Sequence, residues 1–156
     1  MSHYELIQTP EALAAAISAM ADAPWLTVDT EFQRESTYRA KLCLVQVGNG
    51  SNNWLFDALA LDLAPLWERL KHSDTVKVMH SADQDNEVFV QLTGACFEPL
   101  FDTQIAATLL GIGDQLGYAG LVKARLGIEI DKSMSRTDWT RRPLSDKALD
   151  LSLIHI

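Results

Sequence analysis

Residues 25–32 read WLTVDTEF, and their side chains alternate in the manner of a β-strand. The side chains of one face, which can pack on a core, are Leu26, Val28, Thr30 and Phe32. On the other face, Asp29 and Glu31 stand about 7 Å apart, from the rise per residue of a strand. Two such acids on a half-buried strand are unfavourable unless a cation neutralises them or one takes up a proton. A hard divalent metal such as magnesium suits carboxylate oxygens. The alternative is an acidic strand end exposed to solvent, and the strand alone leaves both open.

The length and composition indicate one soluble globular domain. The chain has 156 residues, of which 47% are hydrophobic and 22% are charged. No apolar run approaches the ~20 residues of a membrane span, and the amino terminus lacks the pattern of a secretory signal. Cys43 and Cys96 lack metal-site spacing and are predicted to be reduced core thiols. Together these features predict a cytoplasmic protein without a membrane partner.

The net charge of −8 argues against a protein that grips nucleic acid by charge alone. The charge is uneven, however, because residues 132–147 hold five basic side chains and two acidic ones. Such a segment could contact a phosphate backbone while metals on carboxylates contact the rest. A solvated loop has the same composition, so charge does not decide between the two.

The order of the predicted elements indicates an α/β fold. Residues 4–8 are a plausible strand, and Thr9-Pro10-Glu11 is a good helix start. Residues 42–47 form a nearly continuous apolar strand, and the turn sequence GNGSNN separates it from a third strand at 54–56. Because short links join these strands to the one at 25–32, we expect three antiparallel strands. A further strand is predicted at 76–79.

The helix predicted after His80 separates one acid from its neighbours. Asp85 lies three and four residues before Val88 and Phe89, on the same stripe, which Leu92 continues. Asp83 and Glu87 lie two positions from Asp85, about 200° round the helix, and should face solvent. Asp85 is thus aimed inward, which is costly without a partner. An acid at the edge of the stripe that reaches out to water is the simpler explanation.

A second acid, Asp102, has a structural explanation. The sequence Phe101-Asp102-Thr103 ends a short strand and opens a helix, so Asp102 or Thr103 is predicted as its N-cap.

Four blocks of sequence together resemble the ribonuclease D family. They are VDTEF at 28–32, HSADQDNEVF at 80–89, FDTQIAATLLG at 101–111 and DKSMSRTDWTRRPLS at 131–145. The resemblance runs in unbroken order from about Tyr4 to Asp150. It implies a 3′-to-5′ exoribonuclease of the DEDD superfamily, tyrosine subtype. The implied fold is ribonuclease H-like, with a mixed sheet flanked by helices that is incomplete at the C-terminus.

The resemblance also implies a site. In the family, four carboxylates hold two divalent metals, and a tyrosine positions or activates the attacking water; the matching acids here are Asp29, Glu31 and Asp85. The metals would be Mg²⁺ or Mn²⁺, in a two-metal scheme for in-line displacement at phosphorus. Residues expected to contact the substrate are Thr30, Phe32, His80, and Arg141 or Arg142 on phosphate. Core or edge roles are equally open for Phe32 and His80.

The last part of the family pattern is missing. The register set by RRPLSDKALD places the tyrosine at Leu151 and the fourth aspartate at His155. The final residues, LSLIHI, are also the in-frame translation of a transposon adapter end used in sequencing libraries. We therefore expect an incomplete exonuclease domain at 1–150 and a non-native read-through tail at 151–156. A divergent natural terminus that forms a small hydrophobic helix is the alternative.

The expected function is hydrolysis of single-stranded RNA 3′ ends, with transfer RNA precursors as substrates of the parent protein. This chain is expected to be a monomer with weak activity or none, because one ligand and the tyrosine are missing. A DNA-directed exonuclease of the same superfamily is an alternative, since metal chemistry at phosphate does not read the sugar. A non-catalytic RNA-binding protein that lacks the fourth carboxylate is another.

Overall fold

The chain forms a six-stranded mixed sheet in the order β1-β4-β3-β2-β5-β6. The computed structural model describes residues 4–34, 39–72, 74–130, 137–154 and 156. The strands are β1 Tyr4–Ile7, β2 Trp25–Gln33, β3 Lys41–Gly48, β4 Asn53–Asp57, β5 Val76–Met79 and β6 Leu100–Asp102. β2, β3 and β4 pair antiparallel, while β1, β5 and β6 join the sheet in parallel. The predicted mixed sheet with three antiparallel strands is confirmed.

Six helices are present in the described ranges: α1 Pro10–Ala19, α2 Ala64–Leu70, α3 Asp83–Thr93, α4 Thr103–Leu109, α5 Tyr118–Leu126 and α6 Asp146–Ile154. The start of α1 follows its sequence, because the Thr9 side chain accepts a hydrogen bond from the backbone of Ala12 at 3.2 Å. α5 ends at Gly127, whose φ of 69° is the left-handed conformation that glycine adopts most readily. None of these helices combines the length and apolar character that crossing a bilayer requires.

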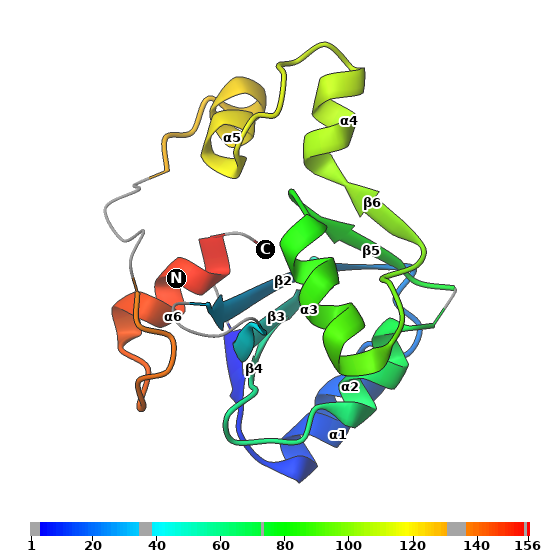
Figure 1. Ribbon diagram of the computed structural model, residues 1–156, viewed down its shortest axis with the longest axis vertical. Coiled ribbons are helices and arrows are strands. Elements are labelled where there is room, and N and C mark those ends of the chain that lie inside the picture. Colours follow the sequence, from blue (N-terminus) through cyan, green and yellow to red (C-terminus); the bar gives the residue numbers. More distant parts are fainter. Residues whose placement is uncertain (1–3, 35–38, 73, 131–136, 155) are drawn as a thin grey trace.

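The two faces of the sheet carry separate cores. On one face, α1, α2 and α3 pack over side chains such as Val28, Val45 and Phe56. On the other, Trp139 and α6 pack over Leu44 and Leu55. Since side chains alternate along a strand, Asp29 and Glu31 belong to the α6 face, next to the second core. α4 and α5 lie beyond β6 at one end of the molecule (Figure 1).

Two local expectations need correction. Leu92 was expected on the buried stripe of α3, but its side chain is 52% exposed, because the last turn of the helix extends past the core. Cys96 was expected to be a core thiol, and it is exposed, whereas Cys43 is buried as expected.

The segment 151–154 continues α6. Leu151 and Leu153 pack against the second core, and Ser152 is fully buried. This is the geometry of the short hydrophobic helix that was the alternative to a tail. The assignment of 151–156 as read-through sequence stays a prediction.

Candidate metal and nucleic-acid site

Two elements bring the three predicted acids to one place. Asp29 and Glu31 project from the same face of β2, and Asp85 comes from the first turn of α3. The ladder between β2 and β5 ends at Thr27. Three residues further on, the Asp85 carboxylate accepts hydrogen bonds from the backbone N–H of Thr30 at 3.1 Å and from its hydroxyl at 2.5 Å. The Asp85 carboxylate therefore contacts the edge of β2 beyond its pairing with β5, at the residue that follows Asp29.

A cleft of about 450 Å³ opens over this junction. Its lining includes all three acids, together with Thr30 and Phe32. A β-bulge shapes the end of β2: Glu31 pairs with β3 at position 44 and Phe32 at position 42, which leaves one extra residue on β3. Bulges bend a strand and change the direction of its side chains, and they are common next to active sites. Phe32 lies beside this bulge of β3 and lines the cleft.

Burial governs the charge on Asp85, which is 8% exposed. Burial raises the pKa of Asp85 to about 6, the negative charge of Asp29 adds to this, and the hydrogen bonds from Thr30 oppose it. The periodicity argument chose the correct face, since the neighbouring acids Asp83 and Glu87 are exposed. Two carboxylates that disfavour each other's charge at the mouth of a cleft form an arrangement that a cation would stabilise.

The donor set suits a hard divalent ion, because all three groups offer carboxylate oxygens. The three groups are not close enough to one another, however: within the described ranges, no three side chains of His, Cys, Asp or Glu stand close enough together to hold an ion. Asp85 is engaged by Thr30, and position 155 lies outside the described residues. The three carboxylates thus have the chemistry that a divalent ion prefers, but their present spacing does not form a three-residue metal site.

An aromatic pair stands close to these acids. The ring of Tyr118, at the start of α5, meets the ring of His80 edge to face, with centroids 5.5 Å apart. His80 Nδ1 lies 2.9 Å from the hydroxyl of Thr103, and that hydroxyl donates to the backbone carbonyl of Met79 at 3.0 Å. Since the hydroxyl proton is already used, His80 Nδ1 carries the hydrogen and donates it. Burial raises the pKa of Tyr118, and the negative charge of Asp29 raises it further.

Comparison with known proteins places the chain in a family. A family model described as "3′-5′ exonuclease" matches residues 4–150. The chain belongs to the 3′-5′ exonuclease family. Curated relatives of this exonuclease domain include the ribonuclease D of Sphingobium indicum, 44% identical over 98% of the chain, and that of Acidiphilium cryptum, 49% identical over 90%. The chain spans 40% of the first relative and 36% of the second.

Solved structures agree with this family. The crystal structure of Escherichia coli RNase D, described as an exoribonuclease involved in structured RNA processing, superposes with a TM-score of 0.93 at 36% identity. The match covers 99% of this chain and 41% of that one. The catalytic core of RRP6 from Trypanosoma brucei shares the exonuclease fold, with a TM-score of 0.87 at 22% identity. The ribonuclease H-like architecture expected from the sequence is thereby confirmed.

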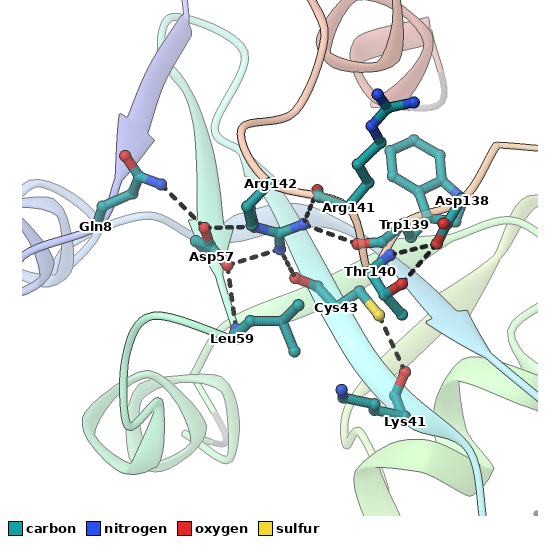
Figure 2. Close-up of polar contacts among 10 residues, drawn as sticks. All are labelled: Gln8, Lys41, Cys43, Asp57, Leu59, Asp138, Trp139, Thr140, Arg141 and Arg142. Carbon is teal, nitrogen blue, oxygen red and sulfur yellow. Dashed lines mark hydrogen bonds and ion pairs between the residues drawn. The ribbon is translucent and has the colours of Figure 1, made fainter.

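In this exonuclease domain, Arg142 serves the fold (Figure 2). Its Nε and Nη2 donate to the two carboxylate oxygens of Asp57, at 2.8 and 2.7 Å. Nη2 also donates to the carbonyl of Cys43, and Nη1 donates to the carbonyls of Trp139 and Arg141. These bonds occupy all five N–H donors of a guanidinium. The phosphate contact expected of Arg142 is therefore corrected to a structural role.

The other residues predicted to contact the substrate differ in how the structure places them. Thr30 lines the cleft, is 7% exposed and donates its hydroxyl to Asp85, and its contact with a substrate stays a prediction. Arg141 is exposed and stays the candidate for phosphate. Phe32 lines the cleft, whereas His80 lies outside its lining and contacts the ring of Tyr118. Positions 132 and 136 of the basic segment lie outside the described residues.

The sequence analysis did not single out two residues that the structure relates to Asp29, Tyr118 and Gln46. Tyr118 follows a glycine-rich turn, and nothing in its local pattern ties it to an acid 89 residues earlier. Gln46 lies within an apolar strand and pairs directly with Asp29 across the β2–β3 ladder. The antiparallel register could have found Gln46, because it places a lone polar residue opposite the first acid.

Proposed function

We propose that this chain carries the metal-dependent catalytic domain of an exoribonuclease that hydrolyses RNA from its 3′ end. The observation that carries the proposal is the convergence of Asp29, Glu31 and Asp85 on one cleft. Membership of the 3′-5′ exonuclease family and the similarity to ribonuclease D of several bacteria support it. RNA is the proposed substrate because the curated relatives reported above are named ribonuclease D.

The residues of the chain would act in defined ways. Asp29 would help to hold both divalent metal ions, Glu31 would help to hold one of them, and Asp85 would help to hold the other. When bound there, a pair of Mg²⁺ or Mn²⁺ ions supplies an activated water and neutralises charge at the phosphate. Thr30 holds Asp85 in place through two hydrogen bonds. Phe32 offers an apolar ring to the terminal nucleotide, and Arg141 offers a cation to a phosphate.

We further propose that this chain alone has weak activity or none. The family pattern has a tyrosine and an aspartate at positions 151 and 155, where this chain has Leu151 and His155. Imidazole is a poorer ligand than carboxylate for magnesium. The loss of one group that acts on the reacting atoms commonly lowers the rate by orders of magnitude. A monomer in the cytoplasm, acting on single-stranded 3′ ends such as those of transfer RNA precursors, completes the proposal.

The test is degradation of a 5′-labelled single-stranded RNA with Mg²⁺ or Mn²⁺. Three chains are compared: the native sequence, a restored chain with Leu151→Tyr and His155→Asp, and the restored chain with Asp29→Asn. We expect the restored chain alone to give a ladder of products shortened from the 3′ end. Circular dichroism of all three chains controls for folding.

Each other outcome points to a different function. Equal cutting by the native sequence would show that another group supplies the fourth ligand. Faster cutting of a DNA strand of the same sequence would favour a DNA-directed exonuclease. If no folded chain cuts, and Asp29→Asn binds RNA more tightly, the chain is a binding protein and the proposal is wrong.

A further inference from the structure

Gln46 is a buried polar residue without an assigned role. It lies in the middle of β3, and no part of its surface is exposed. Among the residues that the structure describes, neither its side-chain oxygen nor its side-chain nitrogen has a hydrogen-bond partner. Buried amides are normally paired, because leaving one unpaired is destabilising. An enclosed amide that the fold retains without a partner therefore needs an explanation.

The register of the sheet limits what Gln46 can reach. Gln46 pairs with Asp29 on β2 and with Leu55 on β4. Residues directly opposite in an antiparallel pair have Cβ atoms about 4.5–5.5 Å apart and share a face. The diagonal neighbours on β2 are Thr27 and Glu31, and the Thr27 hydroxyl already donates to the carbonyl of Gly48 at 3.2 Å. On β4 the diagonal neighbours are Asn53 and Asp57, and both carboxylate oxygens of Asp57 already accept hydrogen bonds. The carboxylate directly opposite Gln46 is that of Asp29, one of the proposed metal ligands.

We propose that Gln46 is a positioning residue for the metal site, whose side-chain N–H₂ donates to a carboxylate oxygen of Asp29 when a cation holds that carboxylate. Carboxylates that bind a metal are themselves held by hydrogen bonds from outside the site, and losing such a bond commonly weakens metal affinity 10- to 100-fold. The inference rests on the proposed function, because it assumes that Asp29 is a ligand. It adds a residue on β3 to a site otherwise built from β2 and α3.

This role predicts opposite effects of replacing Gln46 on stability without a metal and on metal affinity. Without a metal, the amide of Gln46 is a buried group without a partner, so replacing it with an apolar side chain of similar length should stabilise the protein. With a metal, the same replacement removes a bond that orients Asp29. A purely structural glutamine would not separate the two in this way.

The test uses the 156-residue chain and Gln46→Met, which matches the side chain in length and lacks the amide. Mn²⁺ affinity is measured by calorimetry, and the thermal midpoint is measured in EDTA. We expect Mn²⁺ to bind 10- to 100-fold more weakly while the midpoint in EDTA rises. Gln46→Leu repeats the test with a second side chain. The control is Val47→Ala on the opposite face of β3, which should lower the midpoint and leave Mn²⁺ affinity unchanged.

Two results separate the inference from the proposed function. Suppose that the native sequence binds Mn²⁺ and Asp29→Asn does not. If both Gln46 variants then bind Mn²⁺ as tightly as the native sequence, or lose no more affinity than Val47→Ala, Gln46 does not position the site. That result leaves the proposed function intact. If the native sequence and Asp29→Asn bind Mn²⁺ equally, Asp29 is not a ligand, and both the proposed function and the role of Gln46 are wrong.

Discussion

The carboxylate of Asp57 is 1% exposed, and its negative charge is matched by the guanidinium of Arg142. Arg142→Met would leave that charge buried without its cation, and such losses cost about 3–5 kcal/mol. We expect the lower end, about 3 kcal/mol, because the Arg142 side chain is 24% exposed and water can enter. Urea denaturation measures the change. Replacing both partners, as in Asp57→Asn with Arg142→Met, should cost less than Arg142→Met alone; an equal or larger loss would contradict the pairing.

The same pair predicts a pH dependence. Burial alone would raise the pKa of Asp57, but hydrogen bonds from Arg142 and Gln8 outweigh it and hold the pKa below its ordinary value. Because the folded pKa is lowered, the stabilisation is complete above the unfolded pKa of about 3.9 and is lost as pH falls through the folded value. In Arg142→Met, the carboxyl of Asp57 has lost its cation, so the proton that it gains as pH falls removes an unpaired buried charge and relieves the destabilisation. The difference in unfolding free energy between the two proteins should therefore narrow on acidification, and a constant difference from pH 7 to pH 3 would refute this.

Residues differ in how far their sequence neighbours reveal their roles. Asp85 could be placed inward from the helical period alone, because its partners on the stripe lie three and four residues away. Arg142 could not be placed, since its partner Asp57 is 85 residues away and the basic composition of its segment indicated a surface role. The position of Gln46 follows from strand register, and that of Tyr118 follows from helix packing. Local pattern therefore indicates the candidate acids, and only the folded sheet shows which residues lie opposite or beside them.

At the level of elements, one carboxylate joins the starts of two helices. Asp102 accepts hydrogen bonds from the backbone of Gln104 and Ile105 in α4, at 2.8 and 3.4 Å, as its predicted role of N-cap requires. It also accepts from Ser81 and Ala82, at 3.1 and 2.8 Å, just before α3. The order of strand, cap and helix was readable from the sequence. The second set of bonds was not, because it crosses from β6 to the end of β5.

Asp102→Ala should therefore destabilise more than the loss of a single cap. One cap is worth about 1 kcal/mol and at most about 2, and here two helix starts lose an acceptor. We expect a loss of about 2 kcal/mol in thermal or urea unfolding, with Asp102→Asn retaining part of the stability. Because the role is structural, Mn²⁺ affinity of the folded Asp102→Asn protein should equal that of the native sequence. A specific loss of metal binding in Asp102→Asn would instead make Asp102 part of the site.

At the scale of the whole molecule, α4 and α5 present an apolar surface to solvent. Leu109 is 82% exposed and Leu126 is 67% exposed, and a groove of about 310 Å³ lies between the two helices. Contiguous apolar surfaces of this kind promote association. The double variant Leu109→Lys with Leu126→Lys should change the unfolding free energy by no more than about 0.5 kcal/mol per site, because exposed positions carry little packing.

The expected gain from this double variant is in solubility. In sedimentation velocity over a concentration series, the native sequence should be a monomer when dilute and show a rising average mass only at high concentration, while the double variant should stay monomeric throughout. Leu92→Lys provides the control, because Leu92 is an exposed leucine on α3, outside this surface, and gives the same change of side chain. If Leu92→Lys suppresses association equally well, the added charge explains the effect and not the apolar surface. If the native sequence stays monomeric throughout, the surface of α4 and α5 does not drive association, and its leucines serve the chain in another way.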